Sequence, residues 1–186
     1  MRNFEYRAYP TKAQKRRFNG ILRDCCWTYN QGLEERKAEW ETEQEHVSCF
    51  DQIKTLPEKK KQRPSLKQVH SQVLQDVLRR LDKSFKAFFR RAKRGDKPGF
   101  PRFKPHQRYN SFTFPQVGAG GCKITKDGFL AVSKVGNVKI RLHRPLEGTP
   151  KTATIRRTPT GKWFVTFSCE WEPTPLPAND KAVGID

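Results

Sequence analysis

The last six residues of the chain, KAVGID, carry the first candidate for chemistry. Ala182, Val183 and Ile185 are apolar and lead into the carboxylate of Asp186. This pattern is typical of a buried strand that delivers an acidic group to an active site. If Asp186 is catalytic, we expect most of the catalytic domain to lie in sequence that this chain lacks. The alternative is that Asp186 is a frayed terminal residue without a catalytic role.

A second candidate is the segment 79–104, RRLDKSFKAFFRRAKRGDKPGFPRFK, in which Lys and Arg far outnumber the two acids, Asp82 and Asp96. On a helix its phenylalanines would share the core face, so the cations would cover the exposed sides and could track a phosphate backbone. The alternative is a solvated helix face. For Phe100 and Phe103 we expect core packing, with base stacking as the alternative. The candidate cations are Arg79, Arg80, Lys83, Lys86, Arg90, Arg91, Arg94, Arg102 and Lys104.

Two glutamines, Gln72 and Gln75, are expected on the same helix, together with Lys67 and Ser71. A glutamine can form paired hydrogen bonds with N6 and N7 of adenine. The alternative is that an exposed helical glutamine serves only as a good helix former. The acidic stretch 34–45 would be repelled by phosphate, so we expect it to face solvent or a basic partner.

Other catalytic signatures are missing from the sequence. It contains no GxxxxGK[ST], no HExxH, no nucleophile elbow and no CxxC. The cysteines are odd in number and lack metal-ligand spacing, which indicates reduced thiols in a core rather than disulfides or a zinc site. They are Cys25, Cys26, Cys49, Cys122 and Cys169.

Composition points to a folded, nucleic-acid-binding protein. The 186 residues include 13 Phe, 4 Trp and 4 Tyr, which is too aromatic for a disordered chain. The net charge of +19 favours a polyanionic partner, most commonly nucleic acid. An acidic membrane surface is the rival partner, but the N-terminus has neither an apolar h-region nor a myristoylation glycine. We therefore expect a cytoplasmic protein that does not bind membranes.

The elements that would position these residues begin with a strand and a long helix. RNFEYRAY alternates Phe4, Tyr6 and Ala8 with polar residues, as a half-buried strand does. Thr11 and Gln14 form a capping box that predicts a helix over about 12–40. The segment 41–64 is expected to be a loop carrying one short helix.

A second capping box, Ser65 with Gln68, predicts a helix that ends at Gly95. Its apolar stripe comprises Leu66, Val69, Val73, Val77, Leu81, Phe85, Phe88 and Ala92. About two dozen residues separate the two long helices, so a compact helix-turn-helix with its short turn is not supported.

The remainder of the chain predicts strands. The candidates are 109–114, 122–125, 129–132, 138–143, 153–158 and 163–171. In the fourth, Val138, Ile140 and Leu142 are expected to face the core, while Lys139, Arg141 and His143 form a basic outer face. A lone first strand is not stable, so we expect it to close the later sheet. The sequence thus predicts an α+β fold, a small antiparallel barrel with a helical insertion after strand 1.

Several motifs resemble the N-terminal half of the TnpB family, the RNA-guided endonucleases of insertion sequences, also labelled OrfB transposases, which are related to type V CRISPR effectors. They occur in the family's order across nearly the whole chain. The matching segments are YRAYPTKAQ (6–14), TYN (28–30), LQDVLRRLDKSFKAFFRR (74–91), GFPRFK (99–104), SFTFPQ (111–116), KVGNVKIRLHRPL (134–146), RTPTGKWFVTFSCE (157–170) and VGID (183–186).

The resemblance implies a wedge-type, OB-like barrel interrupted by a helical recognition lobe and followed by a RuvC-like, RNase H-like nuclease. It implies residues 1–10 as the first barrel strand, 11–95 as the recognition insertion, 96–172 as the remaining barrel, 173–180 as a linker and 181–186 as the start of the truncated nuclease. The implied partners are a guide RNA and target DNA, with Gln75 and Ser71 contacting a short motif beside the target.

By the same resemblance, Asp186 matches the first of three catalytic carboxylates that hold Mg²⁺. One carboxylate cannot assemble such a site, so we expect no cofactor and no cleavage for this chain alone, and Mg²⁺ only in the full-length parent. Two functional classes follow: a fragment of an RNA-guided DNA endonuclease, or a stand-alone, nuclease-inactive module such as a repressor or the product of a decayed transposon gene. No motif supports a third class, a ribosome-associated basic protein.

Overall fold

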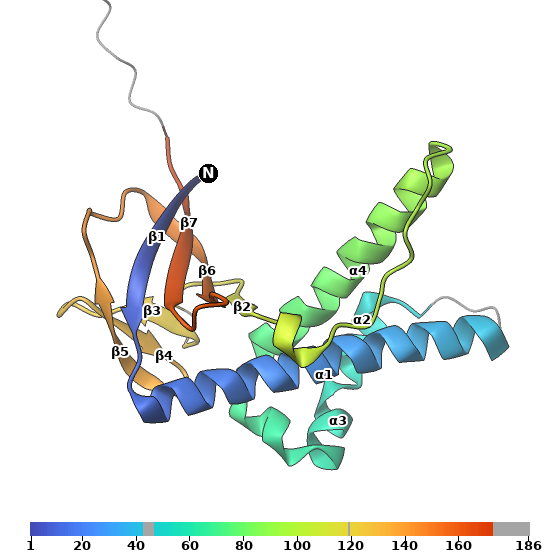
Figure 1. Ribbon diagram of the computed structural model, residues 1–186, viewed down its shortest axis with the longest axis horizontal. Coiled ribbons are helices and arrows are strands. Elements are labelled where there is room, and N and C mark those ends of the chain that lie inside the picture. Colours follow the sequence, from blue (N-terminus) through green and yellow to red (C-terminus); the bar gives the residue numbers. More distant parts are fainter. Residues whose placement is uncertain (43–46, 119, 173–186) are drawn as a thin grey trace, which may run out of the picture.

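The computed structural model describes residues 1–42, 47–118 and 120–172. Within them, N-terminal helices adjoin a nearly closed seven-strand antiparallel barrel (Figure 1). The predicted α+β architecture, a small barrel with helices inserted after its first strand, is confirmed at this level. The expected linker and the first nuclease strand lie outside the described residues. None of the described helices is long and apolar enough to cross a membrane.

The barrel strands follow the order β2-β6-β7-β1-β5-β4-β3. β1 pairs antiparallel with both β7 and β5, so the prediction that the first strand closes the later sheet is confirmed. The strand bounds are β1 Arg2–Tyr9, β2 Ser111–Phe114, β3 Cys122–Ile124, β4 Phe129–Val132, β5 Gly136–Arg141, β6 Thr149–Arg157 and β7 Trp163–Glu170.

Along the strands, apolar side chains alternate with polar ones, and the apolar side chains fill the barrel interior. Phe4, Tyr6 and Ala8 are buried as predicted, and the facing strands contribute further apolar side chains to the same core. Val138 and Ile140 are also buried, but the placement of Leu142 in the core was wrong. β5 ends at Arg141, so the alternation stops there and Leu142 is 42% exposed.

Helix α1 (Lys12–Thr42) connects the barrel with the other helices. The predicted capping box is confirmed, because the Thr11 amide donates to Gln14 Oε1 (3.0 Å) and the Gln14 amide donates to Thr11 Oγ1 (3.3 Å). Phe18, fully buried, packs against Phe112 of β2 and Trp163 of β7, with ring centroids 5.8 and 4.9 Å apart. The first turns of α1 are thereby part of the barrel core.

The segment between the long helices departs from expectation. It contains two short helices, α2 (Cys49–Lys54) and α3 (Leu56–Gln62), and a 3-10 turn η1 (Pro64–Gln68), where we expected one short helix. The second capping box was also wrong, because Ser65 Oγ donates to Asp24 Oδ1 (2.9 Å) instead of capping a helix. Val69 is extended, and helix α4 (Ser71–Lys93) begins only at Ser71. Lys67 therefore lies on η1, not on the long helix.

Helix α4 is amphipathic over most of its length but leaves the core at its C-terminal end. Val73, Val77, Leu81 and Phe85 are buried as predicted, whereas Phe88 is only half-buried and Ala92 is exposed. In Figure 1, this end of α4 rises away from α1, with the extended segment after it running alongside. The expected packing of Phe100 is confirmed in part: its ring lies 5.5 Å from that of Phe85 and 5.3 Å from that of Phe88, although Phe100 stays 44% exposed. Gly95 ends the helix as predicted, with φ 75°.

The long helices approach closely at Gly32 of α1. A Cβ there would lie 3.0 Å from Leu78 Cδ2, 3.1 Å from Leu81 Cδ2 and 3.2 Å from Gln52 Nε2. Both leucines are fully buried, and Gln52 Nε2 donates to the Gly32 carbonyl at 2.8 Å. Gly20, in the same helix, is not closely packed, because a Cβ there would have no atom within 4 Å.

These two glycines yield a matched pair of substitutions. We expect Gly32→Ala to lower the free energy of unfolding by about 1–3 kcal/mol, because fixed leucines must move to admit the methyl group. Gly20→Ala should raise it by up to about 1 kcal/mol, since alanine is the better helix former. Urea denaturation of both variants checks this, and a stable Gly32→Ala protein would contradict the close packing of α1 on α4.

Candidate nucleic-acid interface

Most predicted cations of α4 are exposed to solvent. They lie along the helix and its C-cap and comprise Arg79, Lys83, Lys86, Arg90, Arg91 and Arg94. No acidic residue occupies the last turn of α4 to compensate them. This group, the α4 cations, provides a row of charges that can follow a phosphate backbone.

Arg80 differs from these neighbours, because its side chain is largely covered. Its Nε lies 2.7 Å from Asp76 Oδ2, and Nη2 donates to Thr113 Oγ1 of β2. Thr113 in turn shares a hydrogen bond with Thr154 of β6 at 2.7 Å. The expectation that Arg80 covers an exposed side of the helix was therefore wrong, and Arg80 ties α4 to the barrel.

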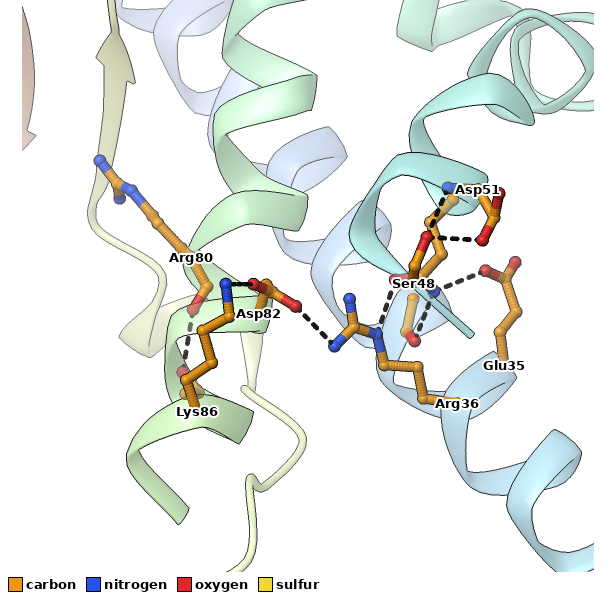
Figure 2. Close-up of polar contacts among 10 residues, drawn as sticks. Glu35, Arg36, Ser48, Asp51, Arg80, Asp82 and Lys86 are labelled. Atoms are coloured by element: carbon orange, nitrogen blue, oxygen red, sulfur yellow. Dashed lines mark hydrogen bonds and ion pairs between the residues drawn. The ribbon is translucent and has the colours of Figure 1, made fainter. Parts of the chain in front are cut away.

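A polar seam that includes one of the α4 cations, Lys86, joins α4 to α1 (Figure 2). Lys86 Nζ lies 2.9 Å from Asp82 Oδ2, and Asp82 Oδ1 accepts from Arg36 Nη1 at 3.3 Å. Burial opposes ionisation of Asp82, but the hydrogen bond from Lys86 and the Arg36 charge hold its pKa below the usual value. We expected the acidic stretch to face solvent or a basic partner, but Glu35 pairs with the buried ammonium of Lys59 in the same chain at 2.7 Å.

The extended segment after α4 is fastened to α1 by Lys104. Its amide donates to Asn30 Oδ1 and its carbonyl accepts from Asn30 Nδ2, both at 2.9 Å. The ammonium lies 4.3 Å from the centroid of the Tyr29 ring, and burial, together with the Arg80 charge, lowers the pKa of Lys104. Two motifs far apart in sequence, TYN and GFPRFK, therefore meet here.

Beside this anchor lies a cavity of about 550 Å³ that brings several predicted cations together. Arg91 of α4 and Arg102 and Lys104 of the extended segment line it. Arg108, which sequence reasoning did not single out, completes the group. The cavity is large enough for part of a nucleotide, and its cations converge from α4, from the extended segment and from the 3-10 turn η2 (His106–Arg108).

The polar residues proposed to read bases are partly occupied by other contacts. Ser71 Oγ accepts from Lys60 Nζ at 2.8 Å, and Gln72 Nε2 donates to Gln116 Oε1 at 2.7 Å. Gln75 is half-buried. Lys67 is exposed on η1 and thus separate from Ser71 and Gln75 on α4.

The outer face of the barrel places cations and aromatic rings in register. Strand pairing sets Arg156 opposite Phe164, Phe164 opposite Arg7, and Arg7 opposite Arg141. We call this the first row. A second row consists of Tyr9, Lys139 and Phe129, also directly opposite one another. Lys139 and Arg141 were predicted, but the other members were not, because their alignment depends on a strand register that alternation alone does not give.

The rows carry an electrostatic cost. Residues directly opposite in antiparallel strands have Cβ atoms about 5 Å apart, so Arg7 and Arg141 repel each other. Part of that cost is offset by the rings, since the Arg7 guanidinium lies 5.0 Å from the Phe164 centroid and 5.5 Å from the Tyr9 centroid. Only Glu5 adds an acid to the cavity beside the rows, and it accepts from Arg156 at 3.2 Å.

No metal site can be described in this part of the chain. Asp186, the expected Mg²⁺ ligand, lies outside the described residues. Within residues 1–42, 47–118 and 120–172, no three His, Cys, Asp or Glu side chains are grouped so that they could hold a metal ion. The five cysteines are free and buried, as predicted, and burial raises their pKa values, that of Cys122 to about 12. Such thiols are inert.

Comparison with known proteins gives this arrangement a context. The family model HTH_OrfB_IS605, described as a helix-turn-helix domain, matches residues 1–45. The described part of that match forms β1 and α1. The chain is also 36% identical over 190 aligned positions to a Streptomyces pristinaespiralis protein titled "Putative RNA-guided DNA endonuclease". It is 28% identical over 190 positions to an Escherichia coli K12 protein with the same title and the name InsQ.

These alignments cover 100% and 98% of this chain but only 45% and 44% of the two relatives. The chain thus spans about half the length of the curated relatives it matches. Over its whole length the chain is homologous to the N-terminal part of these two proteins, both titled as putative RNA-guided DNA endonucleases.

Proposed function

We propose that this chain is the nucleic-acid-binding part of an RNA-guided DNA endonuclease and that it holds the guide RNA. The observation that carries the proposal is the first row, in which three arginines and one phenylalanine lie side by side across four strands. Charge repulsion between Arg7 and the opposite Arg141 lowers the stability of the fold, and a bound anionic ligand would reduce this repulsion. Guanidinium groups bind phosphates, and rings of the same rows offer faces on which unpaired bases stack.

The α4 cations extend this surface toward a duplex. They are exposed, they follow one helix, and Arg91 shares a cavity with Arg102 of the next segment. Charges arranged in this way hold a nucleic acid by its phosphates and add no sequence preference. We therefore assign the duplex formed by guide and target to this side of the molecule.

Reading of the target is assigned to Gln75. Of the two glutamines, Gln72 is bonded to Gln116, whereas Gln75 is half-buried on α4 near Ser71. A paired donor and acceptor on Gln75 can recognise an adenine edge in a short motif beside the target DNA. This assignment follows from the family resemblance and the side-chain chemistry together.

Cleavage is proposed only for the full-length protein. There, Asp186 would contribute one carboxylate to a Mg²⁺ site, and the bound ion would supply Lewis-acid activation of the phosphodiester. The described residues contribute binding and orientation of the nucleic acid. Their positive charge concentrates a polyanion on the barrel face and along α4.

The first row generates a test that separates binding from stability. Arg141→Gln should weaken binding of a structured RNA and lower the salt dependence of log K by about 0.7–0.9, because one phosphate contact is lost. The free energy of unfolding should stay unchanged or rise by a few tenths of a kcal/mol, since repulsion from Arg7 is relieved. Fluorescence anisotropy over a range of KCl concentrations and urea denaturation measure the two quantities.

The control for this experiment is Lys126→Gln, in the exposed turn between β3 and β4. It removes the same charge outside both rows and should leave the affinity within about twofold. A destabilised Arg141→Gln protein with an unchanged salt slope would show that Arg141 is structural.

Adjacent arginines on α4 give a second test. Arg79→Gln should reduce the affinity for an RNA–DNA duplex and leave stability within about 0.5 kcal/mol, as expected of an exposed phosphate contact. Arg80→Gln should instead lower the free energy of unfolding by about 1–3 kcal/mol, because the largely buried Asp76 loses its partner. Equal stability of both variants would contradict the distinct roles assigned to them.

The assignment of Gln75 is tested in a full-length protein. Gln75→Ala should change which target-adjacent motif is accepted, at a cost of about 1–3 kcal/mol for the preferred motif, and leave guide RNA binding intact. Cleavage of a library of randomised flanking sequences reports the preference. Gln72→Ala serves as the control, because Gln72 is committed to Gln116. An unaltered preference in Gln75→Ala would remove Gln75 from the reading role.

A further inference from the structure

A cationic pocket lies apart from both proposed surfaces, where helix α1 meets η1 and the turn between β4 and β5. Its volume is about 430 Å³. It is lined by Arg17, Gly20, Ile21, Arg23, Asp24, Arg63, Ser65, Gln68 and Lys134. None of the four cations in this lining is among the predicted candidates.

The charge of the pocket is unbalanced. Asp24 is its one acidic lining residue, and this carboxylate is 5% exposed and already satisfied. Asp24 Oδ1 accepts from Arg63 Nε at 3.0 Å, Arg63 Nη2 at 2.9 Å and Ser65 Oγ at 2.9 Å. Asp24 therefore fixes one wall of the pocket and neutralises one cation. Three cations remain for an anionic ligand: Arg17, Arg23 and Lys134.

Of these cations, Arg17 is bonded to the backbone, and Lys134 has an unusual backbone conformation. Arg17 Nη1 donates to the carbonyl of Lys134 at 2.5 Å, so α1 and the β4–β5 turn are tied together at the pocket. Lys134 itself has φ 66°, and among the described residues it is the one non-glycine with a positive φ. A side chain in the left-handed region is strained, and such strain clusters at ligand sites. The turn keeps a lysine where glycine would fit better.

Gly20, in the interior of α1, also lines the pocket. Glycine destabilises a helix interior, and it usually persists where the backbone is strained or closely approached. Gly20 has no positive φ, and a Cβ there would meet no protein atom within 4 Å. Gly32, in contrast, is required by the packing of α4. No protein atom therefore fills the space next to Gly20, and cationic residues line the same pocket.

We propose that this pocket binds one phosphate group of the nucleic acid, with Arg17, Arg23 and Lys134 as ligands and the sugar-phosphate chain passing over Gly20. The proposal rests on the proposed function, since it takes nucleic acid as the source of the phosphate. Its walls come from the helices and from the barrel, so one phosphate would clamp the two parts together. This would make the pocket a third contact, in addition to the barrel rows and the α4 cations.

The test fills the pocket without disturbing the protein. Gly20→Leu places a side chain in the open space and should bind nucleic acid at least tenfold more weakly, while melting at or above the wild-type temperature. Gly20→Ala, with a single methyl group, should stay within about twofold in affinity. Lys134→Gly removes a cation and relieves the strained φ, so it should be more stable and yet bind more weakly, with a salt slope smaller by about one.

Three ligands distinguish the source of the phosphate: a structured RNA, a DNA duplex and inorganic phosphate. Whichever of the two nucleic acids loses affinity in Gly20→Leu is the one that enters the pocket. An effect confined to inorganic phosphate, seen as loss of phosphate-dependent thermal stabilisation at constant ionic strength, would overturn the assignment to nucleic acid. Wild-type RNA binding with unchanged binding by Gly20→Leu and Lys134→Gly would overturn the pocket and leave the proposed function standing. Failure of the wild-type chain to bind either nucleic acid would overturn both.

Discussion

Helix α1 has to serve two hydrophobic cores at once, and the remaining architecture depends on this. Near its start Phe18 is buried between rings of β2 and β7, which makes the helix a wall of the barrel. Further along, Gly32 lets α4 approach so closely that a Cβ at this position would lie only 3.0 Å from Leu78 Cδ2. Because α1 packs against the barrel near its start and against α4 further along, it fixes the distance between the barrel and the other helices. The surfaces proposed to bind nucleic acid therefore keep a constant spacing, which a flexible linker would not provide.

Closure of the barrel adds a second constraint. β1 comes first in the chain, yet it lies between β5 and β7, which come more than a hundred residues later. Pairing over such a separation is slow to form and requires the intervening helices to be accommodated first. Barrel and helices are thus expected to fold as one cooperative unit. The same closure creates the first row, because only β1 brings Arg7 between Phe164 and Arg141.

The sequence predicted those features whose signals are local. The alternation in β1, the capping box at Thr11 and the αL residue Gly95 depend on near neighbours in the chain, and all three are confirmed. The box at Ser65 failed, because a distant buried carboxylate, Asp24, competed for the serine hydroxyl. The members of the barrel rows were missed for a related reason. The periodicity of a strand predicts which face of the sheet a residue occupies. Which residue lies opposite it depends on the strand register, and the register is set by long-range contacts.

The same limit applies to the predicted cations. Charge density along 79–104 indicated a basic helix, but it could not show that Arg80 would be drawn to Asp76 while Arg79 stayed exposed. Among the helices, four acidic side chains each form an ion pair with a basic side chain that is at least partly buried. They are Asp24, Glu35, Asp76 and Asp82. Each of these pairs is neutral as a whole, so the net charge of +19 is carried by the remaining charged residues. Self-repulsion of that magnitude weakens a free protein and is relieved by a polyanion, so binding and stability are coupled in this chain.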